Sequence, residues 1–139
     1  MAFRKYKGKT VTRWYPVAAS TAAMTKGSIA SLSSGLIIAA TSSTTALSHV
    51  GVIKKTIATT DADYATARLV PIEVPVEKGV VWEADVTATL VVGDVGLEVD
   101  LTDALTINRG AASVKAAICV GFQSTTKGLF VLELGAGKF

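Results

Sequence analysis

Alternation of apolar and polar residues between positions 70 and 101 is the clearest pattern in the sequence. In residues 70–77 the aliphatic side chains occupy even positions, and proline or glutamate occupies odd ones. The alternation resumes from residue 80 to 90, with Trp82 among the apolar positions. A two-residue period is that of a β-strand with one buried face. We therefore predict two strands joined as a hairpin through Lys78-Gly79, where glycine supplies the positive φ that a short connection requires.

Two prolines refine the prediction for the first of these strands. Pro71 and Pro75 are four residues apart, so they face the same edge of the strand, and neither has an N–H group to offer there. That edge cannot be paired along its whole length. We therefore predict that this segment is an edge strand or an extended lead-in to the next strand.

Short apolar runs separated by turn residues continue through the rest of the chain. They occupy residues 28–32, 36–40, 47–53, 97–101, 114–122 and 129–134. Many short strands with turns between them are typical of a sandwich or barrel, so we predict an all-β fold, a small β-barrel or β-tulip-like domain. The last two runs are predicted to form a terminal hairpin. Residues 61–68 are predicted to form a short helix that begins at Asp61 or Asp63.

Residues 1–16 differ from the rest because cations alternate with aromatic rings. We interpret them as an extended N-terminal arm, with residues 1–25 as arm and linker and residues 26–139 as the barrel domain. Aromatic residues and arginine anchor many protein interfaces. The candidate partner-binding residues are the rings and cations of this segment: Phe3, Arg4, Lys5, Tyr6, Lys7, Lys9, Arg13, Trp14 and Tyr15.

Two other interpretations of this segment remain open. It could be a disordered basic tail, because chain termini tend to fray. It could also bind nucleic acid, since cations neutralise phosphates and rings stack on bases. Nucleic acid is the less favoured partner, because the remainder of the chain is acidic where a supporting basic groove would be expected.

Charge is segregated along the sequence, although the net charge is only +3. The side chains of residues 1–13 sum to +5, whereas those of residues 61–103 sum to −8. Opposite fields at two ends of a chain favour head-to-tail contact between copies, or docking of each patch on a different partner.

The sequence offers little reactive chemistry. His49 is the only histidine and Cys119 the only cysteine, so we predict a satisfied structural histidine and a small buried hydrophobe. The acids at positions 94, 98, 100 and 103 could attract calcium, which takes several oxygen ligands from carboxylates and carbonyls. Their spacing matches no EF-hand loop, which favours a solvated or partner-facing acidic surface. We nominate no catalytic, cofactor or metal residue, and an enzyme is the least favoured class.

Two features bear on membranes and secretion. No apolar stretch reaches the roughly 20 residues that span a bilayer. The basic start is followed by more cations instead of the apolar core of a signal peptide, so neither a membrane partner nor secretion is predicted.

The order of these features resembles that of small decoration proteins of tailed bacteriophage heads. The segments that carry the likeness are the basic N-terminus, Lys26-Gly27-Ser28, His49-Val50-Gly51-Val52-Ile53, Val74-Pro75-Val76, Val81-Trp82-Glu83-Ala84-Asp85-Val86, Val95-Gly96 and Asp100-Leu101-Thr102-Asp103. The resemblance implies a structural virion protein, made in the host cytoplasm, that binds the major capsid protein on the outer surface of a mature capsid and cements neighbouring capsomers. It also implies a homotrimer at local three-fold positions and an arm that grips the shell.

An alternative function belongs to a different class. Small β-barrels also host glycan and receptor sites, and Trp82 or Tyr64 could stack on a sugar ring. The sequence therefore leaves a virion surface module that binds a glycan or receptor as the second hypothesis.

Overall fold

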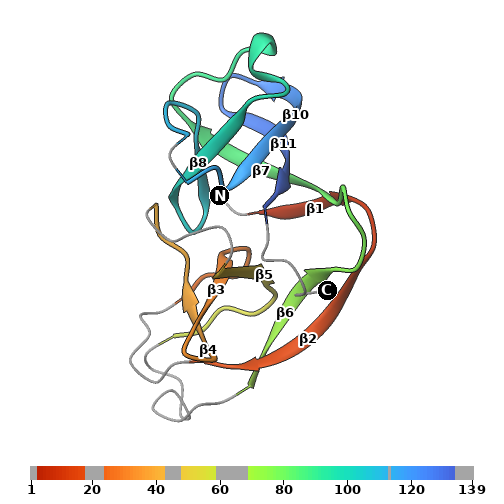
Figure 1. Cartoon of the computed structure of the whole chain (residues 1–139), viewed down its shortest axis with the longest axis vertical. Helices are drawn as coiled ribbons and strands as arrows, with labels where there is room; N and C mark the ends of the chain where they lie inside the picture. The colour runs from red at the N-terminus through yellow and green to blue at the C-terminus, as the bar shows by residue number, and fades with distance from the viewer. Residues whose placement is uncertain (1–2, 18–23, 43–47, 59–68, 113, 134–139) are drawn as a thin grey trace.

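The structure is a computed structural model, and it describes residues 3–17, 24–42, 48–58, 69–112 and 114–133. These residues form an all-β structure of two sheets, one above the other along the longest axis of the molecule (Figure 1). The all-β fold class and the small barrel predicted from the sequence are confirmed. The predicted helix at residues 61–68 lies outside the described residues.

The first sheet closes into a barrel. Its strand order is β1-β7-β11-β10-β8-β9, and β9 also pairs in parallel with β7, so that five strands from β7 to β9 form a closed ring. The strands are β1 (Arg4–Lys7), β7 (Val81–Thr87), β8 (Glu98–Asp103), β9 (Thr106–Asn108), β10 (Ala117–Ser124) and β11 (Lys127–Leu132). The short 3-10 turn η2 (Val92–Asp94) lies at the outer end of the barrel.

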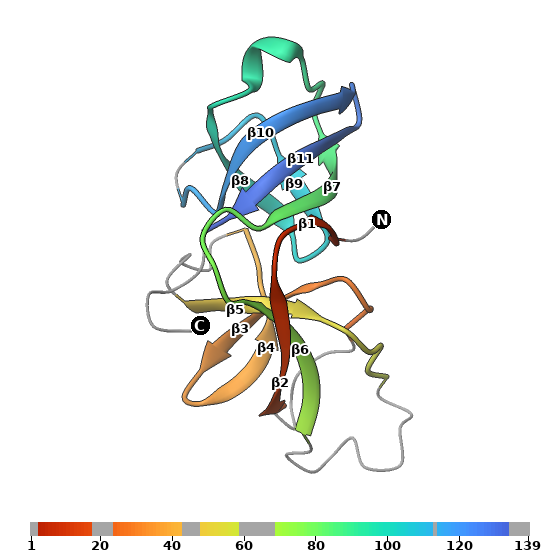
Figure 2. The ribbon, with the colours of Figure 1, turned by 90° about the vertical axis from the view of Figure 1, so that its right-hand side faces the viewer.

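The second sheet has five antiparallel strands in the order β2-β6-β5-β3-β4. They are β2 (Thr10–Pro16), β3 (Ile29–Ser33), β4 (Leu36–Ala39), β5 (His49–Ile53) and β6 (Leu69–Pro75). An isolated bridge between Val17 and Ile37 brings the end of β2 to β4. Figure 2 shows β1 under the barrel and β2 continuing from it down the side of this sheet.

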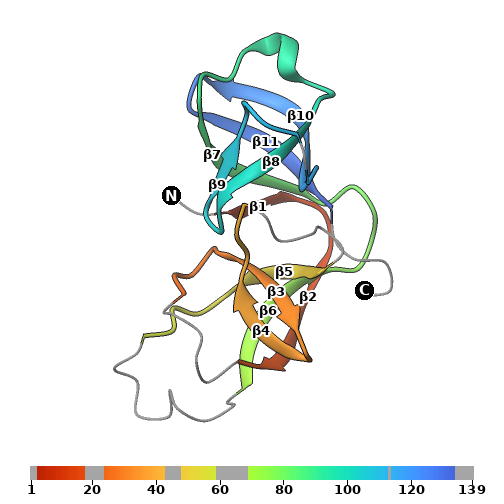
Figure 3. The ribbon, with the colours of Figure 1, turned by 60° about the vertical axis from the view of Figure 1, so that its left-hand side comes forward.

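Buried side chains form two clusters that tie the sheets together. The barrel cluster includes Trp82, Phe130 and Leu90, and it also takes in Ile29 and Val52 from the second sheet. The other cluster lies on the opposite face of the second sheet and consists of Val17, Met24, Ala30, Ile37, Val50, Ile53, Ile57, Val70, Ile72 and Val74. Because one core crosses the junction, the barrel and the second sheet pack as one unit (Figure 3).

The strands predicted from the central alternation are present, but their predicted pairing is wrong. β6 pairs with β2 and β5, whereas β7 pairs with β1, β9 and β11. Gly79 does have a positive φ, +78°. The segment around it carries the chain from the second sheet into the barrel and does not close a hairpin, because each strand finds its partners far away in the sequence.

The position of β6 also differs from the prediction that its prolines place it at a sheet edge. One side of β6 is paired with β2 along seven residues. The prolines face the other side, where the Pro71 carbonyl accepts a bond from the N–H of Lys54 (2.9 Å). Only Val52 and Ile53 of β5 are in register there. Because Pro71 and Pro75 have no N–H groups to donate, the β5–β6 ladder is short. β6 nevertheless lies between β2 and β5 and is not an edge strand.

The terminal hairpin is confirmed, with β10 and β11 antiparallel from Ala117↔Leu132 to Ser124↔Lys127. The register shifts twice along this pair, so the hairpin bends with the curvature of the barrel. Its turn is tighter than the sequence indicated.

Within the described part of the chain, no helix combines the length and the apolar character needed to cross a membrane.

Candidate partner-binding surface

The N-terminal segment contributes one strand to each sheet. β1 pairs with β7 and β2 pairs with β6, with Gly8 between them at a φ of +112°. A Cβ at Gly8 would lie 2.9 Å from the Cα of Val80, so this position requires glycine both for its φ and for the close approach. Residues 4–16 are therefore part of the body, where we had predicted an arm separate from the domain of residues 26–139. The physical reason is that β6 and β7 each have backbone groups that need a partner, and β2 and β1 supply it.

The predicted binding residues divide into buried and exposed ones. Phe3 is only 3 % exposed and packs in the barrel cluster, and its N–H bonds to the Gly27 carbonyl (3.0 Å). Tyr15 is half-buried against the second cluster. Phe3 is therefore a core residue and not the exposed ring of our prediction, whereas Tyr15 stays partly exposed. The exposed residues are Arg4, Lys5, Tyr6, Lys7, Lys9, Arg13 and Trp14.

Two exposed rings stand among these cations. Tyr6 is 59 % exposed and Trp14 is 60 % exposed. Backbone pairing holds both in strands, although their side chains contact little of their own subunit. Large rings on a rigid backbone can be buried by a partner with a small loss of conformational entropy, which is why such residues anchor interfaces.

Strand alternation divides β2 between two faces of the sheet. Val11, Arg13 and Tyr15 lie opposite Val74, Ile72 and Val70, whose side chains face the second core cluster. Thr10, Thr12 and Trp14 occupy the other face, beside Glu73 and the two prolines of β6. We call this second face, together with the exposed residues of β1, the β1–β2 surface.

Hydrogen bonds order the β1–β2 surface. The Thr10 hydroxyl donates to a Glu73 carboxylate oxygen (2.6 Å), and the Lys5 ammonium donates to the same hydroxyl (3.2 Å). The Lys54 ammonium donates to the Thr12 hydroxyl (2.8 Å). The polar side chains around Trp14 are thereby held in place before any partner arrives.

The two oppositely charged stretches of the sequence meet within one chain. Arg4 forms an ion pair with Glu83, and the Lys5 ammonium lies 3.7 Å from a Glu73 oxygen. The Lys9 N–H donates to the Glu77 carboxylate (2.8 Å). These contacts follow from the β1–β7 and β2–β6 pairing, so part of the charge segregation serves folding. Head-to-tail contact between copies, which the charge segregation suggested, is therefore not needed to explain why the basic and acidic stretches lie together.

Glu83 shows how these neighbours act on an acid. A hydrogen bond from Gln123 is the largest influence that lowers its pKa, and the charge and hydrogen bond of Arg4 add to the effect. Lys127, 4.0 Å from Glu83 and 3.9 Å from Asp85, acts in the same direction on the Glu83 pKa. Glu83 therefore stays ionised between two cations.

The acids considered for a calcium site do not gather at one point. Asp94 is buried and binds Arg109 through two contacts of 2.9 and 3.0 Å. Asp100 accepts the N–H groups of Val114 and Lys115 (2.8 and 2.7 Å). Among the residues that the structure describes, no group of three or more histidines, cysteines and acids could hold a metal ion.

His49 and Cys119 are both buried. Neither imidazole nitrogen of His49 has a hydrogen-bond partner in the described chain, which contradicts the prediction of a satisfied histidine. Burial lowers the pKa of His49 to about 4, so the ring is neutral near pH 7. Cys119 is a buried apolar residue as predicted, and burial raises the pKa of its thiol.

The residues named for a sugar site give that alternative no support. Trp82 is 1 % exposed inside the barrel, so it cannot stack on a glycan at the surface. Tyr64 lies outside the described residues.

The sequence reading missed an apolar surface at the end of the barrel. The alternation predicts a strand that ends near Leu90 and another that begins at Leu97, and it assigns no role to the valines between them. Several of those side chains are exposed in the structure. The signal that was available is the scarcity of charge there, because residues 86–97 contain Asp94 as their one charged residue.

Comparison with known proteins does not extend these assignments. No protein-family model matches the chain, and no curated protein sequence matches it significantly.

Proposed function

We propose that this chain is a structural virion protein that binds the outer surface of a phage capsid and bridges neighbouring capsomers through its β1–β2 surface. The observation that carries the proposal is the presence of two exposed rings among cations, Tyr6 on β1 and Trp14 on β2. Each of these strands is held in place by its pairing, β1 with β7 and β2 with β6. Such a surface suits a permanent protein contact, with aromatic anchors surrounded by a charged rim. The sequence resemblance to phage head decoration proteins supplies the identity of the partner.

The charge pattern of this surface favours protein over nucleic acid as the partner. Glu83 pairs with Arg4 of β1, and Glu73 lies 3.7 Å from the Lys5 ammonium, while Glu77 accepts the backbone N–H of Lys9 between the two strands. A groove that tracks phosphates would be positive along its length. A surface of mixed sign fits the mixed charges of another folded protein better.

Deletion of the N-terminal residues is not a clean test of this proposal. Removing residues 1–15 would take away β1 and most of β2, and it would leave β6 and β7 without their partners. Loss of capsid binding would then report loss of the fold. Substitutions of exposed side chains keep the two ladders intact and separate binding from folding.

The test is co-sedimentation of the full chain with mature, expanded heads of the cognate phage. The double variant Tyr6→Ala/Trp14→Ala is expected to bind at least about 100-fold more weakly, as for interface hot spots. Trp14→Phe is expected to retain most of the binding, and Lys55→Glu, an exposed cation outside the surface, serves as the charge control. Thermal melting checks the fold of each variant. Undiminished binding by the double variant would reject the surface, and failure of the wild-type chain to bind heads would reject the function.

A further inference from the structure

The outer end of the barrel carries a cluster of exposed apolar side chains. We call it the tip patch, and it consists of Val91, Val92, Val95, Leu97, Val120 and Phe122. Their exposed fractions range from 37 % to 67 %. A monomeric protein seldom exposes a contiguous apolar patch larger than about 300–600 Å², and such patches often mark interaction sites.

Backbone hydrogen bonds make the tip patch continuous. Leu90 donates to the Thr125 carbonyl (2.9 Å) at one end of the 90–97 segment, and Gly96 donates to the Cys119 carbonyl (2.7 Å) at the other. Cys119 in turn donates to the Leu97 carbonyl (3.0 Å). The segment therefore runs along β10, the strand that carries Val120 and Phe122.

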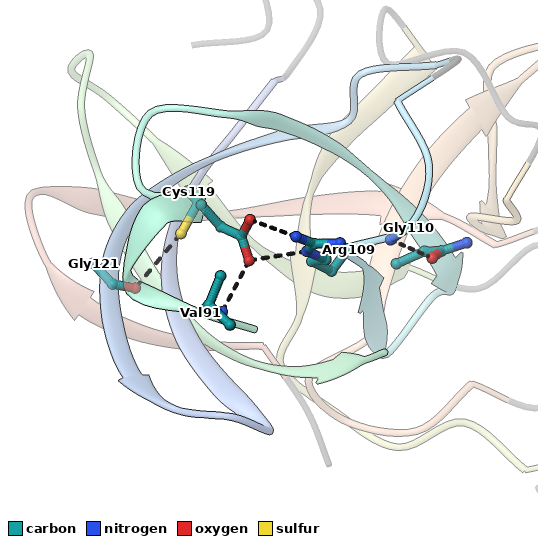
Figure 4. A network of polar contacts seen from close by, with 7 residues as sticks. Val91, Arg109, Gly110, Cys119 and Gly121 are labelled. Carbon is teal, nitrogen blue, oxygen red and sulfur yellow. Dashed lines mark hydrogen bonds and ion pairs between the residues drawn. The ribbon is translucent and has the colours of Figure 1, made fainter. Parts of the chain in front are cut away.

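The charged residue within the patch is neutralised. The Asp94 carboxylate accepts two bonds from Arg109 and one from the Val91 N–H (2.9 Å), and Figure 4 shows Arg109 and Val91 converging on it. The hydrogen bond from Arg109 is the main cause of the lowered pKa of Asp94. These bonds fix the turn that contains Val91, Val92 and Val95. They also pair the Asp94 carboxylate with the Arg109 guanidinium, so that its negative charge is compensated.

Charged residues are scarce around the patch. Residues 116–126, which include most of β10 and its turn, contain no charged side chain, and residues 86–97 contain Asp94 alone. The charges at its margin are Glu98, which is exposed and follows Leu97, and Arg109, whose side chain is 40 % exposed and pairs with Asp94. A partner that matches an uncharged apolar surface must itself be uncharged and apolar, since burial of an unpaired charge is unfavourable.

We propose that the tip patch binds the tip patch of a second copy of this chain. In a symmetric contact the same residues approach from both sides, so charged patches repel while apolar patches complement each other. The tip lies at the far end of the molecule from most of β2, so this association leaves Trp14 free (Figure 1). The inference is independent of capsid binding.

Sedimentation equilibrium of the full chain over a wide concentration range tests the proposal. The wild-type protein is expected to self-associate, and added salt should not weaken the association because it buries apolar surface. Val92→Lys and Leu97→Lys are each expected to weaken it roughly 100-fold, by placing a cation at the contact. The matched control is Leu69→Lys, which alters an equally exposed side chain, 60 % exposed, on the second sheet.

Amide hydrogen exchange on the wild-type chain provides a readout that needs no substitution. Amides of residues 91–97 are expected to gain protection as concentration rises, while those of β2 do not. A wild-type chain that stays monomeric overturns the proposal. So does an oligomer that both tip variants leave intact, or one that salt dissociates.

Discussion

Arg4 and Glu83, 79 residues apart in the sequence, form an ion pair across the β1–β7 ladder. The pair joins the basic start of the chain to its acidic middle. The pair also ties β1 to the sheet that forms the barrel, because the Arg4 side chain reaches Glu83 on the neighbouring strand β7.

The Arg4–Glu83 pair is expected to contribute little to stability. The Arg4 side chain is 75 % exposed, and exposed ion pairs are worth about 0–1 kcal/mol. A double-mutant cycle with Arg4→Ala and Glu83→Ala, measured by urea denaturation, should give a coupling free energy below about 1 kcal/mol. A coupling of several kcal/mol would mean that this pair, and not the backbone ladder, holds β1 in place.

Phe3 should matter far more than its position near the chain start suggests. Phe3→Ala removes a ring from the barrel core, and such truncations lower the free energy of unfolding by about 3–5 kcal/mol. Tyr6→Ala, three residues later and exposed, should change it by less than about 0.5 kcal/mol. Equal effects of the two substitutions in chemical denaturation would contradict the placement of Phe3.

Gly51 is predicted to tolerate no side chain. A Cβ there would lie 2.2 Å from the Glu73 carbonyl oxygen of β6, and backbone cannot easily yield. Gly51→Ala should therefore lower the free energy of unfolding by about 3 kcal/mol or more. Gly93→Ala is the matched control, because a Cβ at Gly93 has nothing within 4 Å. Thermal and chemical denaturation of both variants checks this, and a stable Gly51→Ala protein would refute the close β5–β6 approach.

His49 makes the fold sensitive to acid. Its pKa is about 4 when folded against 6.5 when exposed, so between these values the unfolded chain binds a proton that the folded chain does not. The contribution of the neutral His49 to the free energy of unfolding is therefore fully present above pH 6.5, and it is lost as the pH drops towards 4. The total loss is about 3 kcal/mol, at 1.36 kcal/mol for each unit of pKa difference.

Urea denaturation at several pH values measures this effect. In His49→Leu the dependence between pH 6.5 and 4 should flatten, because no group at that position titrates. Replacing a buried polar group that lacks a partner should also leave stability near neutral pH undiminished. A wild-type chain whose stability is constant across this range would show that the imidazole is not buried as described.

Local periodicity made the strands predictable but not their partners. The alternation around Trp82 marked β7 correctly, and the turn residues before β11 marked the terminal hairpin. The partners of β6 and β7 could not be deduced from the sequence, because Lys78-Gly79 suits a connection between two sheets as well as the turn of a hairpin. Which strand lies beside which is decided by packing between distant segments, and here the core shared by Ile29 and Trp82 decides it.

The candidate binding residues were only partly predictable. Cations and rings at the N-terminus marked a surface of interest, but composition could not separate the buried Phe3 from the exposed Tyr6. β2 hides its strand character because residues 11–14 are exposed on both faces, so no apolar alternation appears. Leu97 differs in the opposite direction, since alternation predicts it on a half-buried strand and the structure exposes it.

The wide sequence separation of β1 from β7 and of β2 from β6 affects how the protein forms in the cell. β1 and β2 pair with strands that are synthesised 53 to 79 residues later, from Pro16↔Leu69 to Arg4↔Glu83. Until then β1 and β2 have no strand to pair with, and completion of both sheets waits for β6 and β7 to emerge from the ribosome. Such distant pairing makes folding slow, because loops must close before the contacts form. Newly made molecules therefore pass through a period in which β1 and β2 are unpaired and open to chaperones or to misassembly.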